Sequence, residues 1–321
     1  MSLTFSEAEA LFGRMLDGEM ADEEIRETLL TLAERGESAE EIAGAAKAMR
    51  ARMKTVAAPE GAIDVCGTGG DGQHSLNIST AVAIVVAACD VPVAKHGNRA
   101  ASSKAGAADT LEALGLNLSN ASAMAEQTLP DLGIAFLFAQ AHHPAMKYVM
   151  PIRKELGRRT IFNLLGPIAN PARVARQLIG IANPDYVPIY RDAMKMLGME
   201  RVMIVSGEEG LDEISIAGPT RIATIGLDAV GDRITPADAG LPTHSLEDIR
   251  GGDAAFNAEA LRRLLQGETS AYRDAVLLNA AGALIVAGEA ESWAEGVEEA
   301  AEAIDKGLAK ALLDCWIAAV S

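Results

Sequence analysis

The sequence predicts an α/β protein that begins with a small, all-helical segment. In residues 1–56 every apolar pattern has helical spacing, whereas from Ala62 onwards short apolar runs alternate with helical patterns. Such alternation favours a mostly parallel central sheet flanked by helices. Residues 258–318 return to helix and are rich in alanine. We therefore expect a helical domain, residues 1–60, and a larger α/β domain, residues 61–321.

The N-terminal segment contains three helical patterns. Their first turns are rich in glutamate, which suits the partial positive charge of a helix N-terminus, and Gly36 is a stop signal between two of them. The sequence AAPEG, residues 57–61, then interrupts the pattern and predicts the domain boundary. The three expected helices are Ser6–Met20, Asp22–Arg35 and Ala39–Met53.

The rest of the chain alternates between the two kinds of element up to residue 225 and is helical after residue 258. The expected strands are Ile63–Cys66, Val91–Ala94, Ile134–Phe138, Gln177–Ile181, Arg201–Val205 and Arg221–Ile225. The expected helices are Ile78–Cys89, Ser103–Leu114, Ala121–Leu129, Val187–Leu197, Ala258–Leu265, Ser270–Ala287 and Ser292–Val320.

Two stretches with internal proline lie between the strands. His143–Arg159 has a helical pattern, but Pro151 lies inside it and is expected to kink or split the helix. Asn163–Pro171 is so rich in glycine, proline and asparagine that we expect irregular structure. We expect both stretches to form a hinge or wall against the N-terminal helices, so that helices from about 143–168 join the helical domain.

Charge and composition exclude several classes of function. The net charge is −17, and a chain this acidic repels nucleic-acid backbones and anionic lipid surfaces. The three cysteines are far apart and have no CxxC spacing, which argues against a zinc site or a disulfide framework. The longest apolar run, Ala81–Cys89, is too short to cross a bilayer, and the first residues have no signal-peptide pattern. We expect a soluble, cytoplasmic protein.

The densest chemical signal is DVCGTGGDGQHSLNIST, residues Asp64–Thr80. A strand is followed by four glycines within six residues, and a helix begins near Asn77. Glycines let backbone N–H groups approach an anion closely, and a helix N-terminus adds positive charge. A glycine-rich turn by itself fits a purely structural role equally well. The hydroxyl groups that follow, on Ser75, Ser79 and Thr80, favour a phosphate site.

A second polar segment, KHGNRAASSKAGAAD, covers Lys95–Asp109 and again follows a strand. Lys95 and Arg99 bring positive charge, and either one alone would be interpreted as a solvated surface charge. Ser102 and Ser103 can cap the next helix while offering N–H groups to an anion. Ligands of open α/β sheets bind outside the carboxyl ends of the strands, which is where both segments are expected.

These segments resemble those of the anthranilate phosphoribosyltransferases, enzymes of the tryptophan pathway. The similarity continues in order through HHPAMK, RTIFNLLGPIANP and GLDE, and it spans the chain from Asp64 to the C-terminus. The resemblance implies a small helical domain hinged to a larger α/β domain, with the active site between them and a homodimer formed through the helical domain. It implies transfer of the phosphoribosyl group from 5-phosphoribosyl 1-diphosphate to the amine of anthranilate, giving N-(5-phosphoribosyl)anthranilate and diphosphate.

The resemblance also assigns residues to ligands. It implies that Mg²⁺ is held by Ser79, Asp212 and Glu213. It implies that anthranilate contacts Gly67, Asn98, His143, Arg153 and Gly166. The residues implied for phosphoribosyl diphosphate are Gly67, Thr68, Gly69, Gly70, Asp71, Ser75, Asn77, Ile78, Ser79, Thr80, Lys95, His96, Gly97, Asn98, Arg99, Ala100, Ala101, Ser102, Ser103 and Ala107. It implies an electrostatic role for Lys95 and no acid or base.

Elementary chemistry agrees with these implied roles. Carboxylate oxygens suit Mg²⁺, although an adjacent acidic pair such as Asp212–Glu213 is more often a solvated turn. A guanidinium such as that of Arg153 suits a carboxylate substrate, whereas a lone histidine such as His143 is more often structural. An aniline nitrogen is already the free amine at neutral pH, so positioning and charge stabilisation suffice without a strong base.

Two other functions stay open from the sequence. A pyrimidine nucleoside phosphorylase shares the helical-plus-α/β architecture, but the KHGN, NIST and GLDE segments argue against it. A non-enzymatic, nucleic-acid-binding paralogue of the same fold would need a basic surface. The net charge of −17 and the Asp212–Glu213 pair oppose that second alternative.

Overall fold

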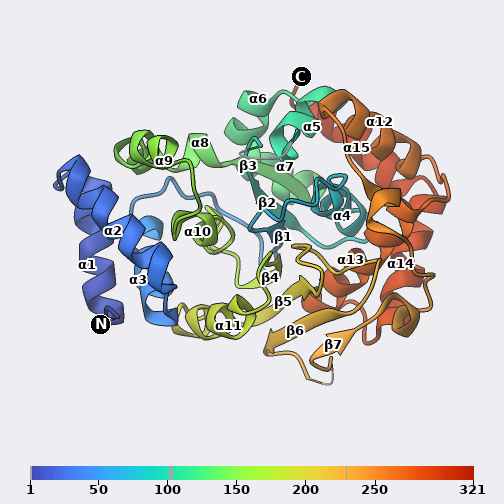
Figure 1. The fold of residues 1–321 in the computed structure, drawn as a ribbon. Helices are drawn as coiled ribbons and strands as arrows, with labels where there is room; N and C mark the ends of the chain where they lie inside the picture. The colour runs from blue at the N-terminus through green and yellow to red at the C-terminus, as the bar shows by residue number, and fades with distance from the viewer. Residues whose placement is uncertain (1, 101–103, 229) are drawn as a thin grey trace.

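The computed structural model describes residues 2–100, 104–228 and 230–321, with a helical part at one end of an α/β part (Figure 1). The first and third helices have capping residues that explain where they begin. Thr4 and Ser38 each form a capping box, with Glu7 and Glu41 respectively, at the start of α1 and α3. The three helices are α1 (Phe5–Asp17), α2 (Asp22–Arg35) and α3 (Ala39–Arg50), which confirms the predicted helical N-terminal part.

The centre of the α/β part is a seven-stranded mixed sheet in the order β3-β2-β1-β4-β5-β6-β7. Strands β1 to β5 pair in parallel, whereas β6 and β7 add an antiparallel edge. The predicted mostly parallel sheet is confirmed, and only the two-residue β7 was not predicted. The strands are β1 (Ile63–Gly67), β2 (Val93–Gly97), β3 (Ile134–Phe138), β4 (Arg176–Gly180), β5 (Arg201–Gly207), β6 (Thr220–Ile225) and β7 (Arg233–Ile234).

The two faces of the sheet bury different clusters because side chains alternate along each strand. Leu178 and Met203 point to a core shared with α4 (Ile78–Ala87) and α13 (Ala271–Ala287). Ile179 and Ile204, one residue further along, belong to a second core with α1–α3, α10 (Phe162–Ile168) and α11 (Tyr186–Met196). Every residue of α13 except Asp274 is buried, so this helix lies inside the protein and not on its surface.

The other helices complete the layers and mostly agree with the prediction to within a few residues. The predicted start of the helix Ser103–Leu114, Ser103 itself, lies outside the described residues. The α-helices are α5 (Ala107–Leu114), α6 (Leu118–Ala123), α7 (Ala125–Leu132), α8 (Ala139–His142), α9 (Met150–Leu156), α10 (Phe162–Ile168), α11 (Tyr186–Met196), α12 (Ala254–Leu265), α14 (Trp293–Asp305) and α15 (Leu308–Ala319). Three short 3₁₀ helices are η1 (Pro144–Tyr148), η2 (Pro236–Ala239) and η3 (Leu246–Ile249).

Three predictions of local structure were wrong. Ser292–Val320 is two helices, because Gly307 has a left-handed backbone (φ 73°) and separates them. Ala121–Leu129 is also divided, at Met124. Asn163–Pro171 is not irregular throughout, since it contains most of α10 with Pro167 in its last turn.

The proline positions explain the last result. Proline fixes a φ that suits a helix, and near the end of a short helix it costs one hydrogen bond at most. The predicted split at Pro151 is confirmed, because η1 and α9 are separate and Pro151 lies in the first turn of α9. In the described part of the chain, none of the helices combines the length and hydropathy that a membrane span requires.

Candidate active site

The candidate site lies where the order of the parallel strands reverses, between β1 and β4. The carboxyl ends of strands open a crevice at such a point. Gly67 and Gly180 end these two strands and lie opposite each other in register. A Cβ atom on either glycine would collide with Asp212. The loop that carries Asp212 and Glu213, called the acidic loop below, therefore lies directly over the ends of β1 and β4, which is possible only because both residues are glycine.

The acidic loop contacts both anion-binding elements that the sequence predicted. The Gly69 N–H donates to Asp212 Oδ2 over 2.6 Å, and the Ser79 N–H donates to Glu213 Oε1 over 3.2 Å. Burial, and then the Asp71 charge, raise the pKa of Asp212, while burial and the Asp212 charge raise the pKa of Glu213. Two of the N–H groups predicted for phosphate thus donate to carboxyl oxygens of the acidic loop in this structure.

Lys95 supplies a positive charge to the same place. Its side chain is buried, and Nζ donates to the Val65 carbonyl over 2.7 Å and to Ser79 Oγ over 3.2 Å. Its charge also lowers the pKa of Glu213, against the effect of burial. A cation on β2, two carboxylates and the start of α4 therefore meet at one point.

The donor atoms at this point fit Mg²⁺ better than a softer metal. The Ser79 hydroxyl and the Asp212 and Glu213 carboxylates offer only oxygen, which Mg²⁺ prefers, and it commonly keeps several waters. Among residues 2–100, 104–228 and 230–321, no group of three or more His, Cys, Asp or Glu side chains is arranged to hold a metal.

The start of α4 has no cap from its own N-cap side chain. Asn77 occupies the N-cap position but its side chain makes no capping hydrogen bond. Its Oδ1 instead accepts from Thr110 Oγ1 at 2.5 Å and from Asn257 Nδ2 at 2.8 Å. Ser75 precedes it in a backbone bridge with Arg250. In the first turn of α4 the carboxylate of the acidic loop takes the place of this cap at one N–H group.

The segment after β2 is only partly available for phosphate. Arg99 pairs with Asp109 and Glu112, each at 2.9 Å, so the protein already neutralises its charge. Asn98 Oδ1 accepts from the Arg99 N–H, and the Ala100 N–H donates to Asp109. Three other predicted phosphate contacts lie outside the described residues: Ala101, Ser102 and Ser103.

Asp64 joins the strands beneath the site and was not predicted as a site residue. It is fully buried, and it accepts hydrogen bonds from the His96 N–H at 3.2 Å and from Asn170 Nδ2 at 2.8 Å. Burial raises its pKa, and the charge of Lys95 acts in the opposite direction. The signal in the sequence was a single carboxylate inside an apolar strand, which requires buried partners.

A second group of predicted residues forms a wall around His96, near the end of β2. His96 Nδ1 lies 2.9 Å from the Gly166 carbonyl, and His96 Nε2 lies 3.2 Å from His143 Nε2. Burial lowers the pKa of His96 to about 3 and that of His143 to about 4, so both rings are neutral at pH 7. Given these partners, neutral His96 carries its proton on Nδ1 and donates it to the Gly166 carbonyl. Neutral His143 carries its proton on Nε2 and donates it to His96 Nε2. No neighbouring atom of the described chain lies within 4 Å of a Cβ placed on Gly166, so open space adjoins this wall.

Arg153 lies near the wall with unused donors. Its guanidinium lies over the Phe162 ring, 5.5 Å from the centroid, and donates weakly to Asn163 Oδ1 at 3.5 Å. Burial lowers its pKa. Within the described ranges, no carboxylate lies within 4.0 Å of it. Arg153 is therefore free to bind a carboxylate that comes from a substrate.

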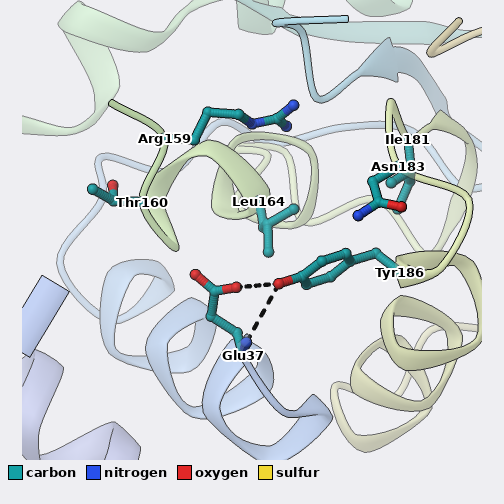
Figure 2. Close-up of a pocket in the computed structure, with 7 residues that line it drawn as sticks. All are labelled: Glu37, Arg159, Thr160, Leu164, Ile181, Asn183 and Tyr186. Atoms are coloured by element: carbon teal, nitrogen blue, oxygen red, sulfur yellow. Dashed lines mark hydrogen bonds between the residues drawn. The ribbon is translucent and has the colours of Figure 1, made fainter. Parts of the chain in front are cut away.

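A cavity of about 120 Å³ lies between Glu37 of the helical part and the residues that follow β4. Figure 2 shows Tyr186 and Glu37 on one side, joined by a hydrogen bond from the phenol to the carboxylate, and Arg159 on the other. Arg159 also donates to the Gly70 carbonyl over 3.3 Å. Leu164 of α10 lies between them. None of these lining residues was predicted as a site residue.

Comparisons with known proteins agree with this geometry. Residues 1–53 match the helical bundle domain of the glycosyl transferase family, and residues 59–310 match its a/b domain. The anthranilate phosphoribosyltransferase of Novosphingobium aromaticivorans is 67% identical, over 98% of this chain and 96% of that protein. The chain belongs to the anthranilate phosphoribosyltransferase family.

Solved structures of the family have the same fold. The anthranilate phosphoribosyltransferase from Thermus thermophilus is 40% identical and has a TM-score of 0.93, with 99% of this chain and 96% of that chain covered. The enzyme from Saccharomyces cerevisiae in complex with PRPP and Mg is 29% identical and has a TM-score of 0.89, with 99% and 93% covered. The yeast enzyme has also been solved in complex with 4-fluoroanthranilate. The yeast enzyme thus binds PRPP, magnesium and 4-fluoroanthranilate.

Proposed function

We propose that this chain performs its family's reaction at the crevice between β1 and β4. It transfers the phosphoribosyl group from 5-phosphoribosyl 1-diphosphate to the amine of anthranilate, in tryptophan biosynthesis. The observation that carries the proposal is the meeting of the Asp212–Glu213 loop with the glycine loop, the start of α4 and Lys95. This combination suits a diphosphate because backbone N–H groups, a cation and metal-binding oxygens meet within one crevice, where a bound Mg²⁺–diphosphate could exchange partners with them.

The phosphoribosyl diphosphate site in this proposal consists of the predicted residues, but Arg99 has a different role. Gly67–Thr80 and Lys95–Ala100 supply backbone N–H groups and the Lys95 ammonium. Arg99 helps to order the loop through its ion pairs and is not the main phosphate cation. Ser79, Asp212 and Glu213 would hold Mg²⁺, which when bound offsets the charge that develops on the leaving diphosphate.

The acceptor site in this proposal is the wall of His143, Gly166 and Arg153. Arg153 binds the carboxylate of anthranilate, and the open space at Gly166 receives the ring. His96 acts as a donor to the Gly166 carbonyl and keeps the wall in place. Neutral histidines suit this role, because a charged pair would repel each other at 3.2 Å.

The chain's own residues then act by position and charge. The amine attacks the anomeric carbon while the diphosphate leaves from the opposite face. The amine needs no strong base, because its nitrogen has a free lone pair at neutral pH. Lys95 and the loop N–H groups stabilise charge on the leaving group, and the wall orients the attacking nitrogen. The residues described at this wall include no carboxylate within reach of Arg153, so substrate and not protein satisfies it.

Domain limits and assembly are also part of the proposal. We place the helical domain at residues 1–60, joined by helices from about 143–168, because α9 and α10 share the second core with α1–α3. The cavity of Figure 2 lies at this junction, about which we propose that the two parts hinge. We propose a homodimer through the helical domain, and we propose the cytoplasm as the compartment of the reaction.

The direct test is a fluorescence assay. The protein is mixed with anthranilate, phosphoribosyl diphosphate and Mg²⁺, and the loss of anthranilate fluorescence is followed. We expect turnover that requires all three components. Phosphorolysis of thymidine or uridine in parallel reactions, with no loss of anthranilate fluorescence, would contradict the proposal.

A further inference from the structure

Helix α13 packs against α4, whose first turn belongs to the candidate phosphate site, and it carries two polar side chains on one face. Tyr272 and Asn279 are seven residues apart, so they lie two turns apart on the same side, about 10 Å along the axis. Both are buried, and apart from Arg273 and Asp274 in its first turn the rest of the helix is apolar. A buried polar group is costly unless it makes hydrogen bonds, so their partners indicate their purpose.

Tyr272 reaches the start of α4. Its hydroxyl donates to the Asn77 carbonyl over 3.1 Å, at the residue where the phosphate-binding helix begins. The same carbonyl accepts the helical hydrogen bond from the Ala81 N–H. The Tyr272 hydroxyl thus anchors the start of α4, at the end of the helix where the Ser79 N–H meets Glu213.

Asn279 reaches the acidic loop. Its Oδ1 accepts from the Ile214 N–H at 2.8 Å and its Nδ2 donates to the Ile214 carbonyl at 2.9 Å. A side-chain amide that bonds both groups of one residue fixes the orientation of that residue's backbone. Ile214 directly follows Glu213, so this clamp determines where the Glu213 side chain begins. A Cβ on Gly282, one turn further along α13, would collide with Ile214, which shows how closely the helix and the loop pack.

The two anchored elements also touch each other. The Ser79 N–H donates to Glu213 Oε1, so α4 and the acidic loop meet next to α13. The contacts form a closed ring that runs from Tyr272 through Asn77 and Ser79 to Glu213, and returns through Ile214 to Asn279. A closed ring restrains its members more than two separate contacts, because displacement of one element must displace the other.

We propose that Tyr272 and Asn279 are positioning residues that hold the phosphate-binding helix and the acidic loop at a fixed spacing for one shared ligand, the Mg²⁺–phosphoribosyl diphosphate complex. The inference rests on the proposed function, because it takes that ligand as the molecule bound between the two elements. Neither residue needs to touch the ligand. Their effect should therefore fall on the affinity for phosphoribosyl diphosphate and not on that for anthranilate.

The test is a double-mutant cycle on binding. The dissociation constant for phosphoribosyl diphosphate, with excess Mg²⁺, is measured by isothermal titration calorimetry for the wild type, Tyr272→Phe, Asn279→Ala and the double variant. The matched control is Tyr190→Phe, because Tyr190 is an equally buried tyrosine whose hydroxyl donates to the Leu164 carbonyl at 2.7 Å, in the core that does not include α4. Steady-state KM values for both substrates are measured in the same proteins.

We expect each single variant to weaken binding about 5- to 20-fold, as the loss of one buried hydrogen bond permits. The dissociation constant of the double variant should be within about threefold of that of the more weakly binding single variant, because one change already breaks the ring of contacts. The KM for anthranilate should change less than about twofold in Tyr272→Phe. Tyr190→Phe should bind phosphoribosyl diphosphate as the wild type does.

Three results would overturn the inference. They are additive effects in the double variant, equal effects in Tyr272→Phe and Tyr190→Phe, or a change confined to the anthranilate KM. If Asn279→Ala does not fold, the comparison of Tyr272→Phe with Tyr190→Phe tests the inference by itself. A wild-type protein that neither binds phosphoribosyl diphosphate nor consumes anthranilate would instead contradict the proposed function.

Discussion

On the phosphate side of the site the charged side chains have partners within the protein, whereas on the aromatic side a charged side chain lacks an oppositely charged partner among the described residues. Asp212 and Glu213 accept backbone N–H groups, and Lys95 has two acceptors. Arg153, in contrast, has no carboxylate partner among the described residues, and Gly166 faces open space. A site that must stabilise a departing diphosphate needs fixed dipoles and charges. A site for a neutral aromatic amine needs mainly a complementary shape and one cation to bind its carboxylate.

The largest expected effect comes from the acidic loop. The double change Asp212→Asn and Glu213→Gln should lower turnover by at least about 10³-fold, because it removes the metal-binding charges while keeping the shapes of the side chains. The fluorescence assay measures it, with circular dichroism to confirm the fold. The matched control is Glu298→Gln with Glu299→Gln, an adjacent acidic pair on α14. Retained activity in the loop variant would refute the metal assignment.

The next largest effect distinguishes the aromatic side of the site from the phosphate side. Arg153→Gln should raise the KM for anthranilate about 10- to 100-fold, because a charged hydrogen bond to the substrate carboxylate is lost. The KM for phosphoribosyl diphosphate should change little. Arg158→Gln is the control, since this nearby arginine is exposed and lies 4.0 Å from Glu34. An equal rise in both variants, or a rise in the KM for the other substrate only, would place the carboxylate elsewhere.

Two glycines sharpen the comparison further. Gly180→Ala should destabilise the protein by about 1–3 kcal/mol, because the new methyl group meets the Asp212 backbone. Gly166→Ala should leave stability unchanged or raise it by up to about 1 kcal/mol, since it replaces glycine inside a helix. It should nevertheless raise the KM for anthranilate about 5- to 20-fold, because the methyl group enters the acceptor space.

Urea unfolding and substrate kinetics together check the glycine pair. If Gly166→Ala were the destabilising change and Gly180→Ala the harmless one, the packing described for the two strand ends and the wall would be wrong.

The smallest effect is a dependence of stability on pH. The pKa of His96 is lowered to about 3 and that of His143 to about 4 in the folded protein. Below about pH 6.5 the unfolded chain therefore binds protons at these histidines that the folded protein does not bind. The stability is therefore complete above about pH 6.5 and falls as the pH drops towards 4, by up to about 1.4 kcal/mol per pH unit for each histidine. His143→Gln should reduce this slope in urea titrations at several pH values. An ordinary midpoint near pH 6.5 for either ring, measured by NMR, would contradict the neutral pair.

Much of the fold and part of the site could be predicted from local sequence. The alternation of apolar runs predicted the order of strands and helices along the chain, and the glycines after Asp64 indicated an anion site. Gly180, Asn257, Tyr272 and Asn279 could not be found in this way. Their roles depend on which distant elements pack together, and a glycine or a tyrosine in an apolar run has no local pattern that reveals its partner.

Predictions also failed where two local rules competed. Asn163–Pro171 contains residues that disfavour helices, yet the buried leucines and isoleucine of α10 stabilise a helix against the second core. Tertiary contacts there outweighed the preference of the segment itself. The phosphate-binding role of Arg99 stays a prediction, and its ion pairs with Asp109 and Glu112 of α5 could not be foreseen from local sequence.

The central claim is that the carboxyl ends of β1 and β2, the start of α4 and the acidic loop bind phosphoribosyl diphosphate together. A crystal structure of the protein soaked with phosphoribosyl diphosphate and Mg²⁺ tests it most directly. We expect the diphosphate to lie against Gly67–Thr80 with Mg²⁺ between it and the Asp212–Glu213 loop. Density for the sugar diphosphate at any other place, with this crevice empty, would contradict the account.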